Sequence, residues 1–233
     1  MPKITGSQSA SPELANILSA VDHKMPIKKN TFLFQQGETV SELYIILSGR
    51  IQIGKISPDG RELTLRICTK NDIVGELALD DEEIKYILNA KVMEDGEVGV
   101  IKKQTLDEKL LTDSKLAMEF LKIMNLNYRR DQTKFRDLVL HGKKGALYST
   151  LIRLSNSYGE KKQEGILLNI SLTNQELANF CGTSRESVNR LLNELKRKEI
   201  IGMVKGKITI YDLDFLKDEI NCENCPIVLC TID

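Results

Sequence analysis

The sequence is poor in the features that mark membrane and secreted proteins. No run of 18 consecutive apolar residues occurs in its 233 residues, and the first twelve residues are polar and rich in serine, whereas a signal peptide has an apolar core. We therefore expect a soluble cytoplasmic protein that does not contact a membrane. The five cysteines do not suit a secreted disulfide framework, because three of them lie in the last twelve residues. They indicate a local site.

Histidine is scarce, and the motifs of common enzymes are missing. The two histidines, His23 and His141, lie far apart in the sequence. No nucleophile–base pair, metalloprotease helix or phosphate-binding glycine loop is found. We therefore do not expect an enzyme.

The net charge of zero conceals a segregation of charge along the chain. Residues 1–128 hold 16 bases and 19 acids, residues 129–207 hold 16 bases and 8 acids, and residues 208–233 hold one base and six acids. The three net charges are therefore −3, +8 and −5. A basic block in a neutral protein indicates a polyanionic partner that binds one region, although a solvated charged surface would also explain it.

The first half of the chain has the pattern of short β-strands. Between Asn30 and about Val100, short apolar alternations are separated by turn residues, as in Leu43 to Leu47 and Leu63 to Ile67. In the turn from Pro58 to Gly60, proline restricts φ, aspartate can bond to the backbone and glycine permits a positive φ. This pattern predicts an antiparallel barrel, roll or sandwich.

A long helix is predicted after this region. Thr112 and Asp113 offer N-caps, and the next glycine is Gly142, so Ser114 to about Leu140 can form one helix. Residues of this helix recur at alternating spacings of four and three, as in a coiled-coil seam. A helix of this length needs a partner surface, although packing on its own domain would also explain the pattern. The predicted seam consists of Ala117, Leu121, Met124, Tyr128, Asp131, Phe135 and Leu138.

Residues 142–210 have the pattern of three helices and a β-hairpin. Two capping boxes, Thr173 to Glu176 and Thr183 to Glu186, lie ten residues apart, with Gly182 at the turn between their helices. Two capped helices this close predict a helix-turn-helix. Apolar residues of the second helix recur at the spacing of a buried face. They are Val188, Leu191, Leu192 and Leu195.

The other face of that second helix is polar near its start, the end that enters a major groove of DNA. An arginine there can donate two hydrogen bonds to guanine, and a glutamate can accept one from cytosine. A β-wing follows, with two lysines placed for phosphates. Double-stranded DNA is therefore the expected partner, although surface salt bridges would also explain the polar face. The candidate DNA-binding residues are Ser184, Arg185, Glu186, Asn189, Arg190, Lys205 and Lys207; Asn193 faces the same way.

Cys222, Cys225 and Cys230 form a C-x2-C-x4-C pattern near the C-terminus. Three thiolates on so short a tether can face one centre, and sulfur ligands in the cytosol suit an iron–sulfur cluster or zinc. A redox disulfide between Cys222 and Cys225, or free thiols in a frayed tail, would show the same spacing. Spacing alone leaves these options open.

Several of these motifs resemble one family. Phe34-x-x-Gly37-Glu38, Leu43 to Gly49 and Asp72 to Leu77 resemble, in order and spacing, the β-roll of the cyclic-nucleotide-binding domains in CRP/FNR regulators, and the resemblance extends over nearly the whole chain. It implies an α+β fold with an N-terminal cyclic-nucleotide-binding-like β-roll, a long dimerisation helix and a C-terminal winged helix-turn-helix. The expected boundaries are 1–111, 112–141 and 142–211 for these parts, and 212–233 for a cysteine-containing extension.

The sequence departs from the cyclic-AMP receptors where these hold the nucleotide. The receptors carry an Arg-Ser pair there that grips the cyclic phosphate, whereas this sequence has four acids, Asp80 to Glu83. These acids would repel a phosphate, and Lys85 cannot replace the bidentate contact of an arginine. We therefore expect no cyclic nucleotide, while a small-molecule effector of another kind stays open.

The resemblance also implies how DNA is read. In CRP/FNR regulators, the residues matching Arg185, Glu186 and Arg190 read a TGTGA-like half-site, and a dimer reads an inverted repeat. Asn189 departs from the family, and no base is assigned to it. The family further implies contact with RNA polymerase and activation of transcription.

Asp131 is the polar member of the predicted seam, and FNR-type regulators are similar in carrying an aspartate at about this place. A carboxylate that meets its symmetry mate weakens association or determines register. Our hypothesis is that Asp131 keeps the dimer poised. It could equally point to solvent or pair with Arg129 or Arg130.

The cysteine tail resembles that of Bacillus-type FNR proteins, whose three C-terminal cysteines bind a [4Fe-4S] cluster, and Lys134 to Gly142 also resembles theirs. In that group an aspartate at the end of the dimer helix is the fourth ligand, and Asp137 stands at the matching position. A carboxylate is a more labile ligand than a thiolate, which would make the cluster sensitive. Asp137 could instead pair on the helix surface with Arg136 or Lys134. The other candidates for the fourth ligand are His141, Cys68 and Cys181.

Together these features predict an oxygen- or redox-responsive transcription regulator. It would activate anaerobic genes by binding a TGTGA-like inverted repeat while its [4Fe-4S] cluster is intact. The alternative is a CRP-like regulator that responds to a different small molecule and has zinc or structural cysteines at its tail.

Overall fold

The computed structural model describes residues 17–76, 83–204 and 206–232. The chain divides into two compact units. The first comprises the described residues up to Gln52 together with Cys68–Asn125, and the second comprises Ile53–Ile67 and the described residues from Leu126 onward. Within the described part of the chain, no helix combines the length and apolarity needed to cross a membrane.

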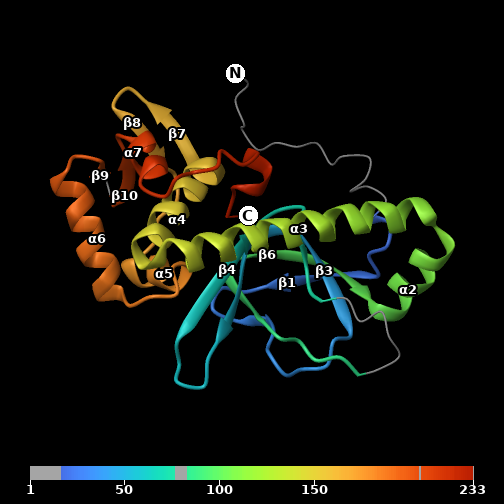
Figure 1. The fold of residues 1–233 in the computed structure, drawn as a ribbon. Coiled ribbons are helices and arrows are strands. Elements are labelled where there is room, and N and C mark those ends of the chain that lie inside the picture. The colour runs from blue at the N-terminus through green and yellow to red at the C-terminus, as the bar shows by residue number, and fades with distance from the viewer. Residues whose placement is uncertain (1–16, 77–82, 205, 233) are drawn as a thin grey trace. The chain divides into compact units, whose positions relative to one another are not determined.

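A six-stranded antiparallel sheet forms the β-roll (Figure 1). Its strands are β1 (His23–Ile27), β2 (Phe32–Phe34), β3 (Glu42–Ile56), β4 (Glu62–Cys68), β5 (Ile73–Val74) and β6 (Asn89–Lys102). The order is β1-β6-β3-β4, and β2 pairs with β6 while β5 pairs with β3. The expected β-roll is thus confirmed, but the expected short strands are not, because β3 and β6 are 15 and 14 residues long and β3 continues through Gly49. Gly49 has a φ of +88°, and a β-carbon there would lie 2.7 Å from the carbonyl oxygen of Glu94, so only glycine fits.

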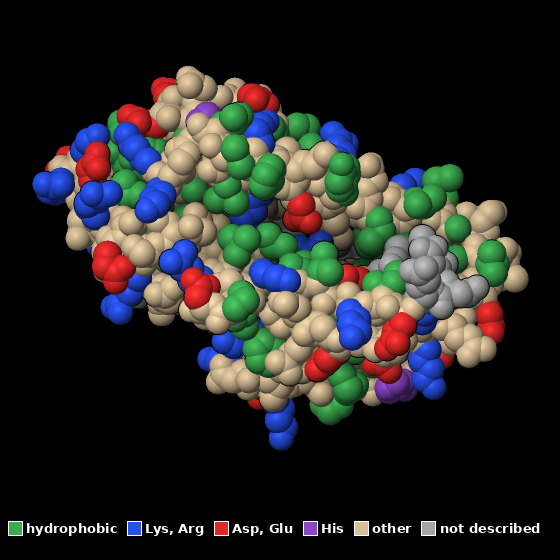
Figure 2. Space-filling model, turned by 60° about the horizontal axis from the view of Figure 1, so that its bottom comes forward, with side chains coloured by type: hydrophobic (Ala, Val, Ile, Leu, Met, Phe, Trp, Pro, Cys, Tyr) green, Lys and Arg blue, Asp and Glu red, His purple; other side chains and the backbone are tan. Residues whose placement is uncertain are grey.

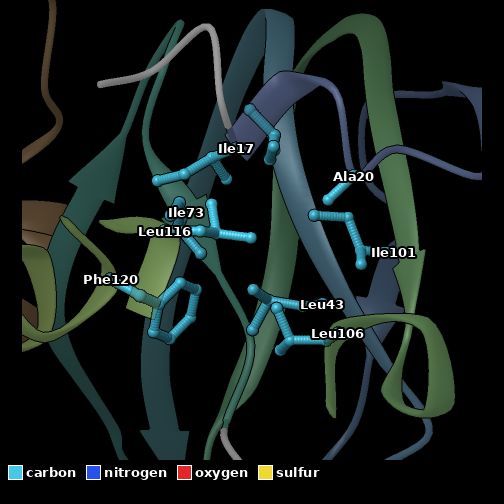
Figure 3. Close-up of a cluster of buried hydrophobic side chains, with 9 residues drawn as sticks. Ile17, Ala20, Leu43, Ile73, Ile101, Leu106, Leu116 and Phe120 are labelled. Atoms are coloured by element: carbon cyan, nitrogen blue, oxygen red, sulfur yellow. The ribbon is translucent and has the colours of Figure 1, made fainter. Parts of the chain in front are cut away.

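A hydrophobic core joins this roll to two helices in the first unit (Figure 3). Leu106 of α2 (Lys103–Thr112) and Phe120 of α3 (Ser114–Leu140) pack with Leu43 and Ile73 of the roll. Helix α3 begins where the sequence predicts, because the Asp113 carboxylate accepts hydrogen bonds from the backbone N–H groups of the first turn. Its first half is therefore anchored on its own β-roll.

The second unit contains the winged helix-turn-helix. Its elements are α4 (Gly142–Tyr158), β7 (Gly159–Lys162), β8 (Gly165–Leu168), α5 (Asn174–Phe180), α6 (Arg185–Arg197), β9 (Ile201–Val204), β10 (Lys207–Ile210), α7 (Leu213–Asp218) and a 3₁₀ turn (Ile227–Leu229). The three predicted helices and the β9–β10 hairpin are present. Sequence analysis missed the hairpin β7–β8, which completes a sheet of order β7-β8-β10-β9, because β7 is fully exposed and lacks apolar alternation.

The hairpin β3–β4 contributes its outer part to this second unit. The buried ammonium of Lys134, on α3, donates to the carbonyl oxygens of Thr64 and Leu65 at 2.7 Å each. The same ammonium lies 4.8 Å from the centre of the Phe180 ring of α5. The Asn179 amide donates to the Glu62 carboxylate at 2.9 Å. Strand β4, α3 and α5 therefore meet around one buried lysine.

Candidate functional site

Helix α6 presents the polar side chains that the sequence predicted. Its buried face consists of Val188, Leu191, Leu192 and Leu195. Arg185, Glu186 and Arg190 are exposed, and they lie in the first two turns, where a recognition helix reads bases. The helix thus offers two arginines and a carboxylate to a ligand without first breaking a buried contact.

The N-cap of α6 lies one residue later than predicted. The Ser184 hydroxyl, and not that of Thr183, accepts the hydrogen bond from a first-turn N–H, that of Ser187. The second capping box is therefore wrong, although the first one, from Thr173 to Glu176, is confirmed with both of its hydrogen bonds. Sequence alone does not separate two adjacent hydroxyl residues, because either can cap a helix.

Two other residues that were predicted to contact DNA form hydrogen bonds within the protein. Asn189 is half-buried and its side-chain oxygen accepts a hydrogen bond from Asn174 of α5. The Lys207 ammonium donates to the side chain of Asn169. Lys205 lies outside the described residues. The side chain of Asn189 therefore links α6 to α5.

Helix α3 carries a row of exposed hydrophobic side chains. Among the predicted seam residues, Leu121, Tyr128 and Phe135 are each more than 60% exposed, whereas Ala117, Met124 and Leu138 are half-buried. Their exposed neighbours on the helix are Asn125, Gln132 and Val139. Exposed hydrophobic side chains are also visible on the face shown in Figure 2, among interspersed acids and bases.

Asp131 is exposed on α3 and lines a small cavity with Arg66, Arg130 and Lys134. Partial desolvation raises the pKa of its carboxyl group, while Arg66 and Lys134 act in the opposite direction. The carboxylate therefore has several cations of its own chain beside it.

The three tail cysteines line one cavity. This cavity has a volume of about 290 Å³, and Asp137 of α3 is part of its wall. His141 and two arginines, Arg136 and Arg153, also line it. The structure thus brings the four predicted ligands to one place, although Asp137 is separated from the cysteines by about 90 residues of sequence.

The Asp137 carboxylate is buried and heavily hydrogen-bonded. Its Oδ2 atom accepts from the Ser149 hydroxyl at 2.6 Å and from Arg153 at 2.9 Å, and its Oδ1 atom accepts from Arg136 at 2.9 and 3.1 Å. Burial alone would raise the pKa of Asp137, but these hydrogen bonds outweigh it, so the pKa lies below its usual value. Asp137 is therefore an ionised buried carboxylate, not an acid of the helix surface.

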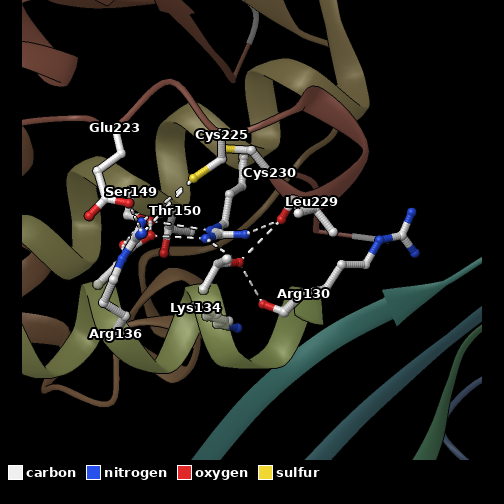
Figure 4. A network of polar contacts seen from close by, with 12 residues as sticks. Arg130, Lys134, Arg136, Ser149, Thr150, Glu223, Cys225, Leu229 and Cys230 are labelled. Atoms are coloured by element: carbon white, nitrogen blue, oxygen red, sulfur yellow. Dashed lines mark hydrogen bonds and ion pairs between the residues drawn. The ribbon is translucent and has the colours of Figure 1, made fainter. Parts of the chain in front are cut away.

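Arg136 connects this carboxylate to the cysteine tail (Figure 4). Its guanidinium nitrogens lie 3.8 and 4.0 Å from the Cys225 sulfur and also bind the Glu223 carboxylate. The predicted pairing of Asp137 with Arg136 is present, whereas the other suggested partner, Lys134, binds β4 instead. The second partner of Asp137 is Arg153 of α4, which sequence analysis missed because nothing local links the two residues.

The tail itself is held by its backbone. The carbonyl oxygens of Val228, Leu229 and Cys230 accept hydrogen bonds from Arg130, Arg153 and Asn156 at 2.9, 3.0 and 2.6 Å. Leu229 and Ile232 are buried, and the Ile232 carbonyl accepts from the Ile67 N–H of β4 at 3.1 Å. The segment from Val228 to Ile232 therefore contacts α3, α4 and β4.

The other candidate ligands differ in their surroundings. His141 lines the cavity, but Cys181 is buried beside the Thr150 hydroxyl, and burial raises the pKa of its thiol to about 11. Cys68 is buried in the first unit. Over the described ranges, no three His, Cys, Asp or Glu side chains approach closely enough to hold one metal ion. A single-ion site is therefore not preformed there.

Three aromatic rings lie together in the first unit. Phe34 stacks on Tyr86 at 3.9 Å between ring centroids and lies 6.1 Å from Tyr44, and all three are buried. The acids Asp80, Asp81 and Glu82 lie outside the described residues. Glu83 accepts a hydrogen bond from the Thr39 hydroxyl at 2.7 Å.

A β-roll, a long helix with an exposed apolar row and a winged helix-turn-helix together define a class of DNA-binding transcription regulators. Residues 24–113 match the cyclic nucleotide-binding domain family, and residues 145–219 match the Crp-like helix-turn-helix domain family. The chain is 54% identical over 228 residues to the "Anaerobic regulatory protein" of Bacillus subtilis (strain 168), covering 97% of this chain and 96% of that protein. It belongs to the CRP/FNR family of transcription regulators, which are not enzymes.

Solved structures of the same family share the fold. The structure of a CooA mutant from Carboxydothermus hydrogenoformans aligns with a TM-score of 0.74 at 21% identity, covering 88% of this chain and 90% of that one. The structure of FixK2 from Bradyrhizobium japonicum aligns with a TM-score of 0.71 at 16% identity, covering 84% and 96%. The expected fold class is confirmed by these alignments.

Proposed function

We propose that this protein is an oxygen-responsive activator of transcription. In this proposal a homodimer binds a TGTGA-like inverted repeat in the cytoplasm while a [4Fe-4S] cluster is held by Cys222, Cys225, Cys230 and Asp137. The observation that carries the proposal is the convergence of these four side chains on one cavity. The name of the Bacillus subtilis relative, an anaerobic regulatory protein, supports the link to oxygen.

The donor set fits such a cluster better than it fits zinc. Zinc in a structural site needs four ligands around one ion, and no such grouping occurs among the described residues. A cluster of four irons distributes its ligands over different metal atoms, so the ligands can stand further apart. Three thiols and an ionised carboxylate around a cavity of about 290 Å³ are consistent with that arrangement.

When bound, the cluster would supply reactivity toward oxygen or nitric oxide, either of which can be the signal. The protein residues provide the mechanical link. Asp137 lies on α3, which carries the exposed row Leu121, Tyr128 and Phe135, and the cysteines follow α7 of the winged helix. A ligand set drawn from both segments would couple the dimer helix to the segment that leaves the reading domain, and its loss would release this coupling.

DNA recognition is assigned to the start of α6. Arg185 and Arg190 can each donate two hydrogen bonds to a guanine, and Glu186 can accept from a cytosine. The exposure of all three side chains supports this role. Ser184, Asn189, Lys205 and Lys207 would contribute contacts around them, and RNA polymerase would be the second partner, as in the resembling family.

The test is anaerobic purification followed by iron and sulfide analysis and an absorption spectrum. We expect about four irons and four sulfides per chain, and tight binding to the inverted repeat that is lost after exposure to air. Cys225→Ser should abolish the cluster, while Cys181→Ala, outside the cavity, should retain it. A chain without iron, or equal DNA affinity before and after air, would contradict the proposal.

The alternative is a CRP-like regulator that responds to a different small-molecule effector in the roll, with zinc or structural cysteines at the tail. The buried stack of Phe34, Tyr44 and Tyr86 and the acids that follow Leu77 argue against a cyclic nucleotide. The colour of the anaerobically purified protein separates the two functions, because a protein that holds an iron–sulfur cluster is brown. A colourless, iron-free protein that still binds the inverted repeat would favour the alternative.

A further inference from the structure

The two oxygens of the Asp137 carboxylate have different environments. Oδ2 faces Ser149 and Arg153 of α4, which are 5% and 2% exposed. Oδ1 faces Arg136, whose side chain is 30% exposed. One oxygen is therefore bound to buried partners and the other to a partner at the rim of the cavity.

Arg153 is held in place beside Asp137 by several hydrogen bonds. Besides Asp137, it donates to the Leu229 carbonyl at 3.0 Å, to the Thr133 hydroxyl at 3.2 Å and to the Ser149 hydroxyl at 3.2 Å. Its displacement would leave a buried guanidinium and several buried acceptors without partners, which is costly. The hydrogen bonds to Oδ2 are therefore retained in any state in which α3, α4 and the tail stay packed.

Arg136 is free to exchange. It approaches Asp137 from the cavity side, and it also holds Glu223, whose side chain is 64% exposed, and touches the Cys225 sulfur. If Arg136 releases Oδ1, its charge keeps the Glu223 carboxylate and solvent as partners. Because the Arg136 side chain is 30% exposed, loss of its ion pair with the buried Asp137 costs less than loss of the fully buried pair with Arg153.

From this asymmetry we infer that Arg136 occupies, in the cluster-free protein, the position on Asp137 that an iron of the cluster takes. It binds Asp137 Oδ1 in the cluster-free protein and yields this oxygen to iron during assembly, while Arg153 and Ser149 keep Oδ2 and orient the carboxylate. In this exchange one iron–oxygen bond forms and the hydrogen bonds from Arg136 to Oδ1 break, and Asp137 neither gains nor loses a proton or an electron. The inference rests on the proposed function, because it assigns Asp137 as a ligand.

The exchange makes Arg136 a competitor of the cluster. Because Arg136 stabilises only the cluster-free state through Oδ1, its removal should shift the equilibrium toward the loaded state. Removal of a residue that only supports the fold would destabilise both states. Removal of a residue that binds the cluster directly would destabilise only the loaded state.

The experiment measures cluster retention against a chelator under strict anaerobiosis. Full-length protein is loaded with ferrous iron and sulfide, and the EDTA concentration that removes half of the cluster is read from the absorption spectrum. For Arg136→Gln we expect this concentration to rise roughly threefold, and urea unfolding of the cluster-free variant to occur at a lower midpoint. Arg136→Lys keeps the charge, so its EDTA concentration should lie between those of Arg136→Gln and the wild type. This variant replaces Arg136→Gln in the test if the glutamine variant does not fold.

Arg130→Gln is the matched control. Arg130 is another half-buried arginine of α3 that contacts the tail, through the Val228 carbonyl at 2.9 Å, but it has no contact with Asp137 among the described residues. Its removal should leave the EDTA concentration unchanged, whereas Arg153→Gln should lower it. An unchanged or lowered value for Arg136→Gln would overturn the inference while the wild-type cluster, and so the proposed function, stands. A wild type that takes up no iron and sulfide would overturn both.

Discussion

Lys134 places an ammonium group in the protein interior, where Asp131 lines the same small cavity and attracts it. Its ammonium is held by two carbonyl oxygens and faces the Phe180 ring. Burial, assisted by repulsion from Arg153, lowers its pKa to about 7, whereas the unfolded chain has the ordinary lysine value of about 10.4. Between these values the unfolded chain binds a proton that the folded chain does not.

The free energy of unfolding should therefore rise with pH above about 7, by at most about 1.4 kcal/mol per pH unit from this residue. Lys134→Met removes this contribution, so its stability should increase less steeply than that of the wild type from pH 7 to 9. Urea unfolding across this range measures both slopes. Lys115→Met, exposed on the same helix, is the control, and identical slopes for all three proteins would refute a lowered pKa of Lys134.

A second test at the residue scale concerns Arg190. It is exposed on the second turn of α6, so Arg190→Ala should weaken binding to the inverted repeat by about 1–3 kcal/mol and relax one base position. Arg197→Ala, at the other end of the helix, should affect specific and random DNA alike. Fluorescence anisotropy with both DNAs measures the difference. An equal loss on both for Arg190→Ala would mean that this residue touches only the backbone.

At the scale of elements, α3 decides how two subunits would meet. Leu121, Tyr128 and Phe135 are exposed together with Gln132, whereas Asp131 is beside Arg66 and Arg130 of its own chain. If the seam follows the exposed row, Gln132→Leu should tighten dimerisation by about 1 kcal/mol through added apolar burial. Asp131→Ala should then have a smaller effect.

Analytical ultracentrifugation of the cluster-free variants over a concentration series tests this register. The reverse order, with tighter dimers of Asp131→Ala and no change for Gln132→Leu, would place the aspartate in the seam and support its role in keeping the dimer poised. A changed DNA affinity of cluster-free Asp131→Ala would also support this role of Asp131.

At the scale of the whole molecule, the tail has a structural task separate from its cysteines. Leu229 and Ile232 are buried, and the Leu229 carbonyl satisfies the buried Arg153. Deletion of residues 227–233 should therefore lower the free energy of unfolding by about 3–5 kcal/mol. Replacement of Cys222, Cys225 and Cys230 by serine should lower it far less in cluster-free protein. Urea unfolding of both variants makes the comparison, and a harmless deletion would mean that the tail is frayed.

Much of the architecture follows from local patterns. The roll, the extent of α3 and the buried face of α6 were predictable, because alternation, heptad spacing and caps act within a few residues. The cap at Ser184 and the exposed strand β7 were not, because adjacent hydroxyls compete equally and an exposed strand has no apolar signature.

The sequence by itself therefore determined the family, the reading helix and a group of three cysteines that share one short tether. Only the tertiary structure decided that Asp137 joins them, that Arg153 of α4 holds its inner oxygen and that Arg136 holds its outer one. These partners come from segments far apart in the chain, and burial leaves an ionised carboxylate stable only where folding supplies enough donors.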